Sequence, residues 1–237
     1  MNRTDTLAIE IDTEIPPATS GRIIAVCVYE GEPLLSRAGY GGPGVLERLI
    51  REEDFKGEAD TFLLLHAAGA KEEPAGTRHL LLLGLGTHGD DDPATLRRAA
   101  SIASRQAVAA HAKELVFILP ECYDRSRMVR AVAEGVGVGL YDGGLYRQAE
   151  EKHGAIERLH IVVSEKSEEL RAEVNRGRIV GEAVNWTRAL ADEPGLSLPP
   201  REFARRAALM AGEFGLHVES LNAEEIRAWH GRPVGRR

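Results

Sequence analysis

The sequence predicts a layered α/β fold, and three of its features lead to this prediction. Short apolar runs alternate along the chain with segments whose apolar residues recur every three or four positions, which is typical of strands separated by helices. Several of the apolar runs show no polar alternation, as expected for strands buried on both faces of a sheet. The composition suits a packed domain, because 43% of the 237 residues are hydrophobic and 28% are charged.

The predicted strands are short apolar runs bounded by charges or turn residues. They cover 7–11, 23–28, 61–65, 79–83, 115–119 and 159–163. The longest uninterrupted runs, around 62–65 and 80–83, are far shorter than the about 18 to 20 apolar residues that cross a bilayer. We therefore expect these runs to form a sheet and expect no membrane span.

Helical periodicity predicts two helices between the later strands. Asp92 is placed to cap the first helix, with Pro93 in its first turn, and apolar residues then recur as far as Ala110. The second helix covers 126–140, where Met128 begins a four-residue repeat of apolar side chains. Its interior glycines, which lower helix propensity, are Gly135, Gly137 and Gly139.

The chain changes character after residue 163, where a long connector helix is predicted. Ser164 or Ser167 can cap this helix. The acidic residues of its first turn stabilise it, because they lie near the positive end of the helix dipole. We expect the helix to end before Pro194, since the residue preceding a proline disfavours helical geometry.

A further unit is predicted after Pro194. Apolar periodicity indicates a helix over 203–214 that ends at Gly215, and an apolar run indicates a strand over 216–221. Asn222 is followed three residues later by a glutamate, which is the spacing of a capping box at the start of another helix. A helix, a strand and a helix start are too little to bury their own apolar faces, because chains below about 40 residues rarely fold unaided.

Charge and cysteine content exclude several classes of protein. The chain has 30 Lys and Arg against 37 Asp and Glu, a net charge of −7, which disfavours a surface that binds nucleic acid over its whole extent, although a local basic patch stays possible. Cys27 and Cys122 do not form the framework of a disulfide-rich protein, and we expect inert thiols. The N-terminus has no features of a secretion signal, so we expect a cytoplasmic protein.

Two glycine-rich segments could bind phosphates. Gly84, Gly86 and Gly89 have the spacing of a dinucleotide-binding loop between a strand and a helix. A plain strand-to-helix turn is favoured, because the aspartates at 90–92 put negative charge where a pyrophosphate would lie and no acidic strand end follows about 20 residues later. A nucleotide-dependent enzyme stays a weaker alternative. The segment 39–44 lacks the Lys-Ser/Thr of a P-loop and is interpreted as a surface loop.

No catalytic, cofactor-binding or metal-binding residue is predicted from local motifs. The eight histidines include no HExxH motif, and no two of them lie three to five residues apart. His66 and His79 flank strands and are interpreted as groups at the edge of the core. The arginines of the connector helix alternate with glutamates at pair-forming spacing, so a solvated ion-paired face is favoured over a phosphate site. These arginines are Arg171, Arg176, Arg178 and Arg188.

Two blocks of sequence resemble the leucyl aminopeptidase family. The first, which resembles the family's N-terminal domain, comprises GEADTFLLLH (57–66), HLLLLGLG (79–86), DPATLRRAA (92–100) and AEGVGVGLY (133–141). The second, GEAVNWTRALADEPG (181–195), followed by LPPREFA (198–204) and FGLHVESLNAEEI (214–226), resembles the junction at which the family's catalytic domain begins. Arg188, Leu190, Glu193 and Pro194 match the pattern of that junction, whereas Asp192 stands where asparagine is usual.

The resemblance implies a fold and an activity for the family. Its members are cytosolic aminopeptidases that use two zinc or manganese ions and are usually hexameric. Their N-terminal domain is a three-layer α/β/α, macro-domain-like fold with a mixed sheet. The family's metal ligands, catalytic lysine and catalytic arginine lie in segments that these 237 residues do not contain. The segment YDGG (141–144) imitates one of them superficially and is assigned no metal role.

The resemblance also implies a domain organisation. We expect a macro-like domain over 1–165, the connector helix over 166–192, the beginning of an incomplete catalytic α/β domain over 193–230, and a tail unlike the family over 231–237. The Arg, Gly and Pro content of the tail suggests a truncated or frameshifted reading frame.

The functional expectation follows from this organisation. The chain would be the non-catalytic N-terminal portion of an aminopeptidase, inactive alone and without cofactors of its own, with an assembly or regulatory role toward copies of itself or intact aminopeptidase subunits. The alternative is a macro-like module that binds nucleic acid or an ADP-ribose-type ligand, and the acidic net charge disfavours the nucleic acid.

Overall fold

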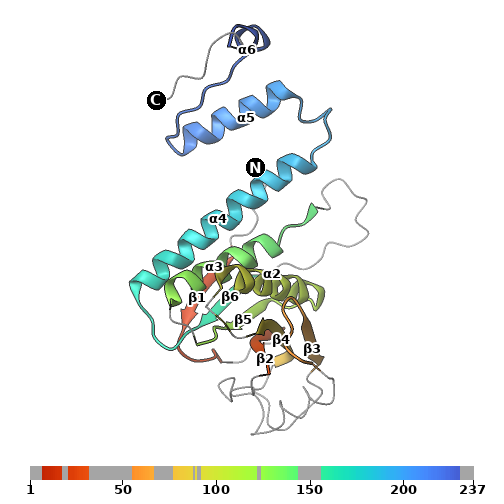
Figure 1. The fold of residues 1–237 in the computed structure, drawn as a ribbon, viewed down its shortest axis with the longest axis vertical. Coiled ribbons are helices and arrows are strands. Elements are labelled where there is room, and N and C mark those ends of the chain that lie inside the picture. Colours follow the sequence, from red (N-terminus) through yellow and green to blue (C-terminus); the bar gives the residue numbers. More distant parts are fainter. Residues whose placement is uncertain are drawn as a thin grey trace. The chain divides into compact units, whose positions relative to one another are not determined.

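The chain divides into two compact units, residues 1–187 and residues 188–237. The structure, a computed structural model shown in Figure 1, describes residues 7–17, 21–31, 55–66, 77–87, 89, 92–121, 124–143 and 156–229. The glycine-rich segment 39–44 and Cys122 lie outside the described residues. None of the helices in these described ranges is both long enough and apolar enough to cross a membrane.

The first unit is built on a six-stranded mixed sheet, which confirms the predicted α/β class. Its order is β1-β6-β5-β2-β4-β3, and every pair of neighbours is parallel except β3 and β4. Each of the six strands predicted between residues 7 and 163 is present, with ends displaced from the predicted bounds. The strands are β1 (Ala8–Asp12), β2 (Arg22–Glu30), β3 (Phe62–His66), β4 (Thr77–Thr87), β5 (Glu114–Ile118) and β6 (Arg158–Val162).

Helices cover one face of this sheet. They are α2 (Pro93–Ala109), α3 (Arg125–Gly139) and the part of α4 (Glu168–Asp192) that belongs to the first unit. The main hydrophobic core lies between this face and the helices, and it unites strand residues such as Ile23 and Leu81 with helix residues such as Ala100 and Val132. Burying such apolar surface is the main stabilising term of the fold.

The opposite face of the sheet has its own apolar cluster, which contains Ile24, Leu82 and Val116. Among the described residues, Ile15 and Phe55 pack against this cluster from outside the sheet. The central strands are therefore apolar on both faces, which explains why their sequences show no polar alternation.

The glycines of α3 allow the helices to pack closely. A Cβ atom at Gly135 would lie 2.2 Å from the carbonyl oxygen of Arg97 in α2, and one at Gly139 would lie 2.0 Å from the hydroxyl of Ser104. Gly177 of α4 approaches α3 in the same way, because a Cβ atom added there would lie 2.3 Å from the carbonyl oxygen of Arg130. The helix predicted over 126–140 is confirmed, and the cost of glycine in a helix is offset by this close packing.

The second unit contains α5 (Pro200–Glu213) and α6 (Ala223–Trp229). The capping box is confirmed, because Asn222 Oδ1 accepts from the backbone N–H of Glu225 at 3.0 Å and the Glu225 carboxylate accepts from the backbone N–H of Asn222 at 2.6 Å. The strand predicted over 216–221 is wrong. Residues 216–221 are exposed and form no strand, and no strand of the described residues pairs with them.

Candidate functional site

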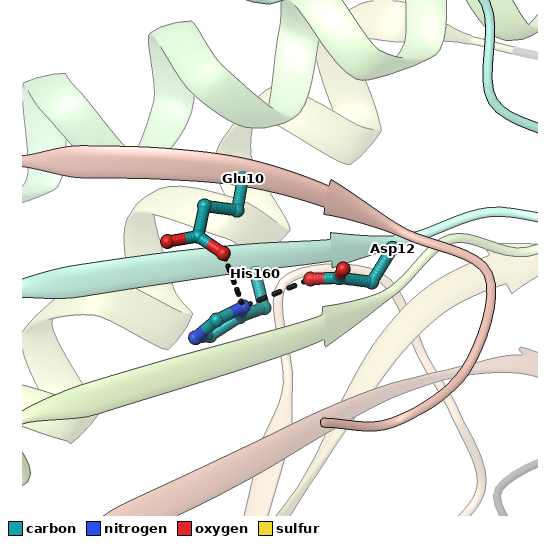
Figure 2. Close-up of side chains that lie close together, drawn as sticks. All are labelled: Glu10, Asp12 and His160. Carbon is teal, nitrogen blue, oxygen red and sulfur yellow. Dashed lines mark hydrogen bonds and ion pairs between the residues drawn. The ribbon is translucent and has the colours of Figure 1, made fainter. Parts of the chain in front are cut away.

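Three side chains that can ligate metals meet on β1 and β6 (Figure 2). Glu10 and Asp12 lie two residues apart on β1, so both point to the same side of the strand. Glu10 is the register partner of His160 on β6. The Nδ1 atom of His160 lies 2.9 Å from Asp12 Oδ2 and 3.8 Å from Glu10 Oε2. We call this group the β1/β6 cluster.

Burial differs across the β1/β6 cluster. The His160 side chain is 7% exposed, Asp12 is 22% exposed and Glu10 is 56% exposed, so the cluster opens to solvent on the Glu10 side. Lys166 adds a positive charge, with Nζ 3.0 Å from Asp12 Oδ1. Burial alone would raise the pKa of Asp12, but hydrogen bonds and charge from His160 and Lys166 outweigh it and hold this pKa below its usual value. Asp12 is therefore ionised at neutral pH.

An imidazole with two carboxylates is chemically suited to a divalent transition metal, and a histidine hydrogen-bonded to an aspartate is also a common structural pair. Local sequence motifs do not reveal this cluster, because His160 lies 148 residues from Asp12 in the chain. The only local signal was the alternation of Glu10 and Asp12 in a strand. The pairing of β1 with β6 brings the third ligand to them.

The glycines with dinucleotide-loop spacing have a structural use. Gly84 and Gly86 lie within β4, and their backbone N–H groups donate to the carbonyl oxygens of Thr61 at 2.9 Å and Gly57 at 2.8 Å. A Cβ atom at Gly84 would lie 2.0 Å from the carbonyl oxygen of Glu58, so only glycine lets this turn approach the strand. Gly84 and Gly86 therefore belong to the strand and not to the strand-to-helix turn in which they were predicted.

The N-terminus of α2, where a pyrophosphate would have to bind, is occupied by the chain itself. The Asp92 carboxylate accepts from the backbone N–H groups of Ala94 at 2.9 Å and Thr95 at 3.0 Å. It thereby takes the donors that an anion would need and adds a negative charge beside them. The predicted cap with Pro93 in the first turn is confirmed.

Asp92→Ala is expected to lower the free energy of unfolding by about 1 kcal/mol at neutral pH, the usual cost of losing an N-cap. Hydrogen bonds from Thr95 and from the Ala94 backbone hold the pKa of Asp92 below its ordinary value. The contribution of Asp92 is therefore present above the unfolded pKa and lost as the pH falls through the folded pKa. Denaturant titrations at neutral pH and below about pH 3 should show the difference between the two proteins shrinking. A difference that is equal at both pH values would contradict this account.

The arginines of the connector helix form the predicted ion-paired face. Arg171 pairs with Glu168 at 2.7 Å, and Arg176 pairs with Glu173. Arg178 pairs with Glu182 one helical turn later, at 2.5 Å. Arg188 is exposed in the last turns of α4.

The remaining sequence candidates do not assemble a site in the described residues. His66 and His79 are register partners across β3 and β4. Tyr141 and Asp142 follow the end of α3.

An open groove of about 710 Å³ lies over α2 and α3. The arginines that line it form ion pairs or hydrogen bonds with other residues of the first unit. Arg97 lies 3.2 Å from Glu134, Arg98 lies 2.8 Å from Asp60, and Arg105 donates to Ser101 at 2.7 Å. The groove also exposes apolar side chains, which are Phe62, Ile102, Val138 and Val184.

Comparison with known proteins relates this chain to one family. The model of the cytosol aminopeptidase family, N-terminal domain, matches residues 25–150. A probable cytosol aminopeptidase of Solibacter usitatus is 33% identical over 182 residues, 76% of this chain and 36% of that protein. One of Roseiflexus castenholzii is 28% identical over 217 residues, 90% of this chain and 42% of that protein.

Solved structures share the fold. A mutant of tomato leucine aminopeptidase matches with a TM-score of 0.79 at 19% identity, covering 97% of this chain and 47% of that one. The bottromycin maturation enzyme BotP matches with a TM-score of 0.63 at 25% identity, covering 89% of this chain and 41% of that one. The chain thus spans about a third of the length of the Solibacter relative and less than half of each of the two solved chains.

Proposed function

The chain belongs to the cytosol aminopeptidase family, whose N-terminal domain it carries, and from this premise we propose that it is the non-catalytic N-terminal portion of an enzyme that releases N-terminal amino acids from peptides. The match of residues 25–150 to the N-terminal domain carries the proposal, because these residues form the centre of the sheet and helices α2 and α3. The proposed location is the cytoplasm, in keeping with the names of the relatives.

We further propose that these 237 residues have no peptidase activity alone. Two-metal hydrolysis needs carboxylates that hold both ions and a polarised carbonyl with an activated water beside it. In the family that the chain resembles, these groups lie in segments that the 237 residues do not contain.

The purified chain is therefore expected to release no p-nitroaniline from leucine p-nitroanilide in the presence of Mn²⁺, beyond the rate in buffer. The full-length relative of Solibacter usitatus, assayed in parallel, is the positive control. Cleavage that copurifies with the chain and is abolished by a chelator would contradict the proposal.

The second unit supports an assembly role. Its large apolar side chains are unusually exposed, at 98% for Leu196, 72% for Phe214 and 60% for Leu216. Clusters of exposed apolar side chains mark surfaces that bind other proteins. We propose that this unit supplies contacts to copies of the chain or to intact aminopeptidase subunits.

Light scattering is expected to show the chain at micromolar concentration with a mass above that of the 25.8 kDa monomer. Phe214→Ser should shift the equilibrium toward the monomer, because it removes an exposed apolar group from the proposed surface. Glu219→Ser, a polar change at an exposed position of the same unit, is the control and should leave the mass unchanged. A monomeric native chain would count against self-association and leave intact subunits as the partner to be tested by copurification.

A further inference from the structure

We propose that Glu10, Asp12 and His160 bind one divalent transition-metal ion of the zinc class at the β1 edge of the sheet. No ion is assigned to these residues by the family relationship, and the proposal stands independently of the proposed function. It replaces, for these three side chains, the expectation from the sequence that the chain holds no metal.

The donor set fits such an ion. An imidazole nitrogen and carboxylate oxygens are usual zinc ligands, at about 2.0 to 2.2 Å from the metal. Candidate ligand atoms of the three side chains all lie within 4.8 Å of one another. Two ligands of a tetrahedral ion lie about 3.3 Å apart. The distances from His160 Nδ1, 2.9 Å to Asp12 and 3.8 Å to Glu10, bracket that separation, so small side-chain movements bring all three onto one ion.

The scaffold holds the ligands in place. Asp12 and Glu10 are in register with β6 through a continuous parallel ladder, and the His160 side chain is packed into the sheet with only 7% of its surface exposed. Its Nδ1 atom points between the two carboxylates, as Figure 2 shows. The exposed Glu10 side leaves a path for the ion and for water in the remaining coordination position.

Charge also favours a cation at this place. Two carboxylates face one lysine, and the Lys166 ammonium already lies against Asp12 at 3.0 Å. Lys166 is 41% exposed, so it can move into solvent when an ion binds Asp12. In the absence of metal, Lys166 partly neutralises Asp12, and Lys166 therefore competes with the metal for that carboxylate.

Isothermal titration calorimetry of the full chain with Zn²⁺ tests the proposal. The native chain should bind one ion. Glu10→Gln removes a direct ligand and should weaken Zn²⁺ binding at least as much as the loss of a hydrogen-bond partner of a ligand does, which is about 10- to 100-fold. Lys166→Met should tighten Zn²⁺ binding about tenfold, because it removes the competing charge. Glu14→Gln alters an exposed carboxylate just past β1 and should have no effect.

A second readout identifies the ligands. With Co²⁺ as the probe, the native chain should show visible absorption bands of a low-symmetry site, and His160→Asn should abolish them. Glu10→Gln keeps the test decisive if the His160 variant does not fold. Absence of Zn²⁺ binding, or Zn²⁺ binding that is equally strong in Glu10→Gln, would overturn the proposal, the latter result indicating adventitious binding at another histidine.

Discussion

Arg22→Met is expected to lower the free energy of unfolding by about 3 to 5 kcal/mol, because it leaves a buried carboxylate without its main partner. The side chains of Arg22 and Glu114 are 1% and 3% exposed, and Nε and Nη2 of Arg22 donate to Glu114 Oε2 at 3.1 and 2.9 Å. Arg22 Nη1 also donates to the carbonyl oxygen of Pro16 at 2.6 Å. Arg158 remains paired with the other oxygen of Glu114, but about half of its side chain is exposed, so it cannot replace the buried charge.

Denaturant unfolding followed by circular dichroism measures this effect. Lys113→Met is the matched control, because the Lys113–Glu157 pair has exposed side chains, at 54% and 59%, and the loss of a pair screened by solvent should lower the stability far less. The double variant Arg22→Met/Glu114→Leu should recover part of the lost stability, since it removes both buried charges. Equal costs for Arg22→Met and Lys113→Met would contradict the assigned role of the buried pair.

Gly135→Ala is the second substitution with a large expected effect, a loss of about 1 to 3 kcal/mol from overpacking between α2 and α3. The added Cβ atom would lie 2.2 Å from the carbonyl oxygen of Arg97 and 2.9 Å from Ala100 Cβ. Both atoms belong to α2, so the two helices would have to move apart. This cost exceeds the about 0.5 to 1 kcal/mol that alanine gains over glycine in a helix.

Gly137→Ala in the same helix is the control. Its Cβ atom would lie 3.5 Å from the Gly181 Cα atom, an ordinary van der Waals distance. This variant should be neutral or slightly more stable, because only the helix-propensity gain remains. Thermal and denaturant unfolding of the two variants compare the effects directly, and an equal loss at both positions would show that the close approach of α2 and α3 is not the cause.

Local sequence patterns predicted the regular elements of the first unit well. Strands such as β5 and helices such as α2 were found because alternation, periodicity and capping act over a few residues. The prediction failed for 216–221, where an apolar run was interpreted as a strand. A strand depends on hydrogen bonds to a neighbour, and a run of residues does not carry information about whether that neighbour exists.

The family could also be recognised from the sequence, because its motifs are contiguous segments such as 57–66 and 181–195. The functional interpretation of other motifs needed the structure. The glycines at 84 and 86 match a nucleotide-binding spacing, but the structure explains them by the approach of the turn at 57–61. The glycines of α3, which lowered the predicted helix propensity, are explained by contacts with α2 and α4.

The sequence by itself determined the α/β class, the order of the strands and helices along the chain, the capped starts of α2 and α6, and the family. Only the tertiary structure decided the order of strands in the sheet, and with it the neighbours of each charged side chain. It placed His160 beside Glu10 and Asp12, and it buried Arg22 against Glu114 across β2 and β5. The physical reason is that propensity and periodicity are local, whereas strand pairing joins residues far apart in the chain, here 148 positions for Asp12 and His160.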